Sequence, residues 1–146
     1  MEAQNYANHR QLVPAFHYVL LPLLLVTLIG SAHNLYISIA TDDHQRLSSA
    51  VLILAMMISF VMLAFLSRIF ALKAQDRAIR AEENLRHYAL TGKLLDARLT
   101  PRQITGLRFA SDAEFPALAQ RAAAENLAVN DIKKAVKNWR PDTYRV

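Results

Sequence analysis

The sequence predicts an all-α membrane protein, a two-helix transmembrane hairpin whose second span is extended into the cytosol and followed by a small three-helix cytoplasmic region. Two apolar stretches, Phe16–Ile37 and Leu47–Ile69, each reach the roughly 20 residues that a helix needs to cross the hydrocarbon core. The second stretch continues without a proline or glycine into a charged segment that ends at Gly92. Short segments with helix-start signals follow it.

Length, charge and cysteine content narrow the class of protein. The 146 residues leave room for one small domain and a membrane anchor. The absence of cysteine excludes disulfides, thiolate catalysis and iron–sulfur clusters. Of the 17 Lys and Arg residues, only Arg10 and Arg46 precede Arg68, which leaves 15 from Arg68 onward. Basic residues near span ends mark the cytoplasmic side, so we expect both termini to be cytoplasmic.

These patterns divide the chain into five segments. They predict a polar N-terminal tail at 1–11 lying along the membrane surface, a first transmembrane helix at 12–39, an external connector at 40–46, a second transmembrane helix with a cytoplasmic extension at 47–90, and a basic helical cytoplasmic domain at 91–146. Pro22 predicts a kink in the first span, because it leaves the carbonyl of Tyr18 without a donor. A cleaved signal peptide is the competing interpretation of the first stretch, and its apolar length argues against that.

A polar face marks the first span. Its members follow a 4-3-4 spacing: Thr27, Ser31, Asn34 and Ser38. Because lipid offers these side chains no partner, we expect this face to pack on protein, most simply on the second span. The alternative is that the hydroxyl groups bond carbonyls of their own helix, which Asn34 does least easily.

A seam of small residues marks the second span and its extension. It alternates three- and four-residue steps and consists of Ala64, Ser67, Ala71, Ala74, Ala78, Ala81 and Leu85, with Tyr88 continuing it. Such a seam lets another helix approach closely with left-handed crossing. Charged residues, Glu83 among them, avoid it, and Asp76/Arg80 and Glu82/Arg86 have the spacing of ion pairs on the solvated side. Helix propensity alone is the other explanation for these alanines.

The C-terminal region carries three helix-start signals. Thr100–Gln103 and Ser111–Glu114 each read as a capping box, and the second opens a helix to about Glu125. Asn130 is expected to cap a third helix that Pro141 terminates. The expected core consists of Ile104, Leu107, Phe115, Leu118, Leu127, Val129, Ile132, Val136 and Trp139. A core of this size is marginal alone, so we expect it to rest on the projecting helix or the membrane.

A basic face is predicted on the last of these helices. It consists of Lys133, Lys134, Lys137 and Arg140. The plainest interpretation is a solvated face over a small core. Attraction to anionic lipid headgroups is the second interpretation. Nucleic acid binding is the least favoured, because these side chains supply phosphate contacts only.

No arrangement of residues indicates an enzyme, so we expect no catalytic, cofactor or metal site. His17 and His33 lie sixteen residues apart on one helix, on nearly opposite faces, and cannot share a haem. Asp42, Asp43 and His44 are adjacent donors that cannot surround an ion alone. Arg68 is expected to reach the inner headgroups rather than an ion path.

Three blocks carry a family resemblance: FALKAQDRAIRAEE, LTPRQITGLRFASDAEFP and IKKAVKNWRPDTYRV. They resemble an uncharacterised bacterial family, a domain of unknown function found in small two-span membrane proteins. The resemblance implies a bacterial inner-membrane protein with a helical cytoplasmic tail. It implies no activity and assigns no residue a role.

The functional expectation is therefore a membrane-anchored structural or interaction protein. Its seam would pair with a second copy of the chain or with a larger membrane complex. The alternative is a subunit of an oligomeric transporter or channel, in which the polar face of the first span would line a pathway.

Overall fold

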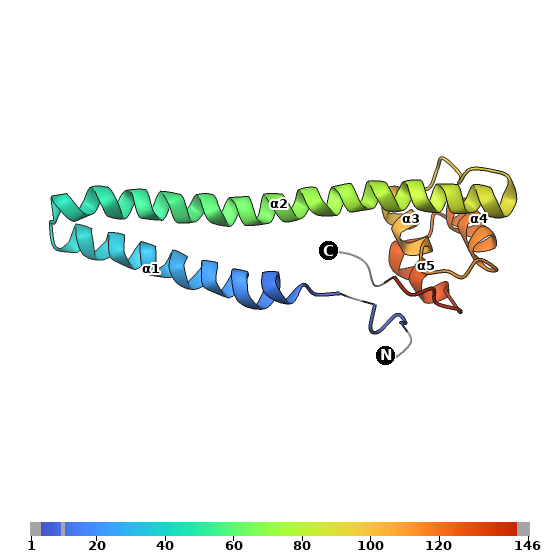
Figure 1. Ribbon diagram of the computed structural model, residues 1–146, viewed down its shortest axis with the longest axis horizontal. Coiled ribbons are helices and arrows are strands. Elements are labelled where there is room, and N and C mark those ends of the chain that lie inside the picture. Colours follow the sequence, from blue (N-terminus) through green and yellow to red (C-terminus); the bar gives the residue numbers. More distant parts are fainter. Residues whose placement is uncertain (1–3, 10, 143–146) are drawn as a thin grey trace. The chain divides into compact units, whose positions relative to one another are not determined.

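The computed structural model describes residues 4–9 and 11–142, and the named elements of this part of the chain are all helices. The elements are a π-helix η1 (Ala15–Leu20), α1 (Leu21–Ala40), α2 (His44–Thr91), α3 (Pro101–Leu107), α4 (Phe115–Glu125) and α5 (Val129–Ala135) (Figure 1). The all-α part of the predicted fold class is confirmed. The chain forms two compact units, which we call the hairpin unit (Leu12–Phe70) and the C-terminal unit (the residues up to Gln11 together with Ala71–Val146).

The hairpin unit places α1 antiparallel to the first half of α2 (Figure 1). The connection is short, with Asp42 in the left-handed region at φ 55°. Asp43 Oδ1 accepts the amide of Arg46 at 3.0 Å, so a carboxylate satisfies a free donor at the start of α2. That helix consequently begins three residues before the predicted Leu47. Ala15–Ala40 and His44–Thr91 are long and apolar enough to cross a membrane, by length and composition.

A widened turn occupies the place where Pro22 was expected to disturb the first span. The π-helix η1 directly precedes α1, and the amide of Leu21 donates to the carbonyl of Phe16, five residues back. Pro22 has no amide hydrogen for the carbonyl of Tyr18, so the regular ladder cannot continue through this turn. The helix accommodates the proline by widening.

The two helices of the hairpin face one another along stripes of alternating three- and four-residue steps. These stripes consist of buried or half-buried positions: His17 in η1, Leu21, Leu24, Leu28, Ser31, Leu35 and Ser38 on α1, and Leu47, Ala50, Leu54, Met57, Val61, Ala64 and Arg68 on α2. This period is that of left-handed helix pairs. The most buried members are small, which allows the backbones to approach. At the open end the Arg68 guanidinium lies over the Phe16 ring, 5.6 Å from its centroid.

The core of the C-terminal unit is formed largely by α3, α4 and α5. Of the predicted core, Ile104, Leu107, Phe115, Leu118, Ile132 and Val136 are buried. Leu127 and Trp139 pack against this core and are partly buried, and Val129 is half-buried. The prediction missed Phe109, which is fully buried. Phe109 belongs to no helix, so periodicity gave no sign of it.

Of the two capping boxes predicted in the C-terminal unit, one forms completely and the other only in part. Thr100 and Gln103 form the complete capping box at the start of α3, with the Thr100 amide donating to Gln103 Oε1 at 2.8 Å. Ser111 and Glu114 form only half of one, because the Ser111 hydroxyl has no hydrogen-bond partner within the described residues. The Glu114 carboxylate instead also accepts the backbone amides of Lys137 and Asn138, at 3.2 and 3.1 Å.

The third helix differs most from its prediction. It begins at Val129 after Ala128, so the expected Asn130 cap is wrong, and it ends at Ala135 rather than near Pro141. Val136 is extended, and the chain then runs beside Phe109–Ser111, with a bridge between Ala110 and Trp139. Extension buries Val136 and lays Trp139 on Phe109 with the ring centroids 4.9 Å apart. This apolar contact outweighs the last helical turns.

Residues 4–9 of the N-terminal tail pack on other parts of the C-terminal unit. The His9 ring lies 5.7 Å from Phe109 and 5.8 Å from Trp139, between centroids. Gln4 Oε1 accepts the amide of Asp142 at 2.7 Å. Lys133 Nζ lies 3.0 Å from His9 Nε2. We call residues 4–9 the N-terminal clasp.

Candidate functional site

One face of the C-terminal part of α2 is covered by the rest of its own unit. Arg86 donates to Glu83 Oε2 (2.9 Å), to Asp112 Oδ1 (2.7 Å) and to the carbonyl of Ala110 (2.7 Å). Its guanidinium lies over the Phe115 ring, 4.4 Å from the centroid. The Glu83 side chain is only 6% exposed. Glu83 avoids the seam as expected, but the expected Glu82/Arg86 pair on the solvated side is wrong, because Arg86 is largely buried and pairs with Glu83.

The predicted seam lies mostly on the other side of this helix. Ala64 is the exception, because it is buried in the stripe that faces α1. The other members, Ser67, Ala71, Ala74, Ala78, Ala81 and Leu85, are exposed. Leu85 is 68% exposed and Tyr88, which continues the seam, is 54% exposed. From Ser67 onward, the seam residues are thus exposed and no other described part of the chain covers them.

The polar face of α1 is partly buried within the chain and partly exposed. Ser31 and Ser38 are buried, Asn34 is half-buried and Thr27 is exposed. Each hydroxyl group donates to a carbonyl of its own helix: Thr27 to Leu23 (2.7 Å), Ser31 to Leu28 (2.8 Å) and Ser38 to Asn34 (2.8 Å). The hydroxyl groups of this face therefore bond carbonyls of their own helix, as the alternative prediction held.

The predicted basic face is not one helical face, because α5 ends before two of its members. Lys133 contacts His9, and Lys134 Nζ lies 5.8 Å from the centroid of the Tyr6 ring. Lys137 is exposed. Arg140 lies 3.6 Å from the second carboxylate oxygen of Glu83. Three of the four side chains thus hold parts of the C-terminal unit together.

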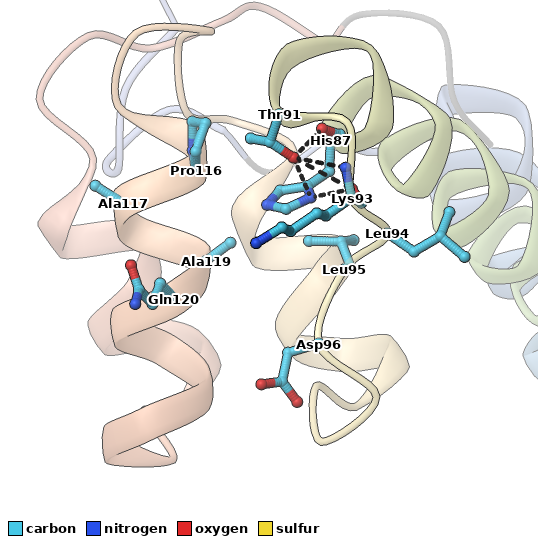
Figure 2. A pocket seen from close by; sticks show the side chains of 10 residues that line it. All are labelled: His87, Thr91, Lys93, Leu94, Leu95, Asp96, Pro116, Ala117, Ala119 and Gln120. Atoms are coloured by element: carbon cyan, nitrogen blue, oxygen red, sulfur yellow. Dashed lines mark hydrogen bonds between the residues drawn. The ribbon is translucent and has the colours of Figure 1, made fainter.

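A surface cavity of about 530 Å³ lies between the end of α2, the loop after it and α4. It is lined by His87, Thr91, Lys93, Leu94, Leu95, Asp96, Pro116, Ala117, Ala119 and Gln120 (Figure 2). Sequence reasoning did not find it, because the three lining segments are polar or mixed and none has a ligand-binding motif. The described part of the chain contains no group of three or more His, Asp and Glu side chains placed to hold a metal ion.

Asp96 lines the cavity and should titrate at unusually low pH. Arg98 Nη2 donates to Asp96 Oδ2 at 2.7 Å, and this bond lowers the pKa of Asp96 from 3.8 to about 2. Because the pKa is depressed in the folded protein, the pair stabilises the fold above pH 3.8 and loses its effect as the pH falls toward 2. An NMR titration of the Asp96 carboxyl carbon should show this midpoint, and Arg98→Ala should return it to the ordinary range. An unchanged midpoint in that variant would contradict the assignment.

Comparison with known proteins gives one match. The model of a family of unknown function, DUF6526, matches residues 1–146. No curated protein and no solved structure matches the chain. Because the match spans the whole sequence, the chain belongs to the DUF6526 family, whose function is unknown.

Proposed function

We propose that this chain is a membrane-anchored structural or interaction protein of the bacterial cytoplasmic membrane, whose seam pairs with the seam of a second copy. The hairpin unit would be the anchor, and the C-terminal unit would lie in the cytosol. The proposal is non-enzymatic. The observation that carries it is the one-sided covering of α2: the face bearing Glu83 is buried, while Leu85 and Tyr88 on the other side are exposed.

The exposure of the hairpin supports the membrane anchor. In the most apolar 18-residue window of each long helix, only 6% of the residues are buried within the chain. A core helix of a soluble protein would be mostly buried. Two helices with uncovered apolar surface of this extent need another solvent, and hydrocarbon supplies it.

The packing of the N-terminal clasp supports the proposal that both ends of the chain lie on the same side of the membrane. Residues before the first helix and after the second pack in the same unit. A chain that crosses a bilayer twice returns to its starting side, so this packing is consistent with a hairpin anchor. The excess of basic residues from Arg68 onward favours the cytosol as that side.

The seam itself supports pairing rather than transport. Its small side chains at alternating three- and four-residue steps allow two helices to pack closely over the whole segment. The hydroxyl groups of the α1 polar face are bonded within their helix, which favours a packing role for that face.

Cysteine crosslinking in native membranes tests the pairing. The chain has no cysteine of its own, so Ala74→Cys and Ala78→Cys introduce unique thiols. A disulfide forms only when the Cα atoms come within about 7 Å, so we expect oxidised dimers of twice the chain mass at both positions. Arg80→Cys is the matched control, exposed but off the seam. Dimers at Arg80→Cys alone, or an adduct with a different protein at the seam, would overturn self-pairing.

A further inference from the structure

The cavity beside His87 has the size and wall composition of a small-molecule site. Its volume of about 530 Å³ falls within the roughly 300–1,000 Å³ of such pockets. Leu94, Leu95, Pro116, Ala117 and Ala119 supply an apolar wall, and His87, Lys93, Asp96 and Gln120 supply the polar groups. Apolar walls with few polar groups suit a ligand that has one polar end and one apolar end.

The end of α2 holds the His87 ring in one orientation. His87 Nδ1 lies 2.7 Å from the backbone carbonyl oxygen of Lys93. Because a carbonyl oxygen only accepts, Nδ1 carries the hydrogen and Nε2 of the neutral ring carries the lone pair. The Thr91 hydroxyl also contacts both groups, at 3.2 Å each, and the Phe115 ring packs edge-on, 5.8 Å away between centroids. The ring is thereby fixed with Nε2 directed into the cavity (Figure 2).

The turn after α2 places the Lys93 side chain on the wall of the same cavity. Gly92 has φ 71°, a conformation that side-chain-bearing residues rarely adopt, and it reverses the chain so that Lys93 returns past His87. The Lys93 side chain extends into the same space as the His87 ring (Figure 2). Within the described residues its ammonium group has no hydrogen bond or ion pair. The carboxylate on the cavity wall, Asp96, is already bonded to Arg98.

We propose that this cavity binds a small organic carboxylate with a short apolar body. The Lys93 ammonium would pair with the carboxylate, and the apolar body would lie along Leu95, Pro116 and Ala119. The His87 ring, held by the Lys93 carbonyl, lines the same cavity and would report its occupation.

The other charges near the cavity are already paired. On the loop, Asp96 is paired with Arg98. The lining residues of α4 are uncharged. One turn before His87 on α2, Glu83 is bonded to Arg86. A bound carboxylate is thus the negative charge that remains available to Lys93.

Titration of the full chain in detergent, with ¹⁵N-labelled histidine, tests the proposal. The probes are hexanoate, its neutral analogue hexanamide, and acetate, which has the charge without the apolar body. We expect hexanoate to shift the His87 Nε2 resonance saturably, because the ring lines the cavity. Hexanamide and acetate should bind much more weakly. Lys93→Gln should weaken hexanoate binding about tenfold or more.

Two controls separate the site from general effects of detergent or folding. Lys73→Gln changes an exposed lysine of α2 outside the cavity and should leave hexanoate binding unchanged. The exposed His44 of the hairpin connection should show no saturable shift. The proposal is overturned if hexanoate gives no saturable shift at His87, if hexanamide binds as tightly, or if Lys93→Gln binds like the unaltered chain. None of these results depends on whether the seam pairs.

Discussion

Arg86→Ala is expected to lower the free energy of unfolding of the C-terminal unit by about 3–5 kcal/mol. The substitution removes the donor that satisfies Glu83, whose side chain is 6% exposed, and leaves this carboxylate with only Arg140 at 3.6 Å. A buried charge without a close partner is among the costliest defects in a protein. Trp139, the chain's only tryptophan, reports unfolding of this unit by fluorescence in a urea titration.

Two further variants distinguish a lost partner from a lost side chain. Arg80→Ala removes an exposed arginine from the same helix and should change the unfolding midpoint little. Glu83→Leu combined with Arg86→Met replaces the pair by apolar groups and should restore much of the stability. If Arg86→Ala is as stable as Arg80→Ala, the buried network contributes little to this unit.

Phe109→Ala should have a comparable effect, about 3–5 kcal/mol, together with release of the N-terminal clasp. Phe109 is fully buried, and its ring contacts both Trp139 and His9. Removing it opens a cavity in the core and deletes the surface on which the clasp packs. Urea unfolding followed by far-ultraviolet circular dichroism measures the stability. A spin label at Ala7→Cys should become mobile in the variant.

His9→Ala provides the matched comparison, because it removes the clasp contacts and leaves the core intact. The expected loss is smaller, about 1–3 kcal/mol, from two ring contacts and the hydrogen bond with Lys133. The label at Ala7→Cys should become mobile here too. A label that keeps its spectrum in both variants would mean that other contacts hold residues 4–9.

The features that could be predicted from the sequence are those encoded within a few residues. Thr100 and Gln103 satisfy one another three residues apart, so their capping box is visible in the sequence and present in the fold. The lengths of the two apolar helices follow likewise from continuous hydropathy. Part of the α4 signal failed: the Ser111 amide donates to Glu114 as expected, but the Ser111 hydroxyl accepts no bond from a described residue in return, and the helix begins only after Glu114.

The features that could not be predicted depend on contacts between distant segments. Periodicity placed Arg86 on the solvated side with Glu82, because it contains no information about Ala110 and Asp112, which Arg86 bonds from distant parts of the sequence. The end of α5 was missed for the same reason: Trp139 leaves the helix to meet Phe109. The cavity beside His87 arises only when the loop after α2 returns beside α4, a juxtaposition that no local pattern records.

The N-terminal clasp also constrains how the molecule is made. Gln4 finds its partner Asp142 across 138 positions of sequence. During translation the first residues leave the ribosome long before Phe109 and Trp139 exist, so the clasp has no surface to pack on at that stage. The clasp therefore closes only after synthesis is nearly complete, and a nascent chain halted before Phe109 lacks the surface that holds it.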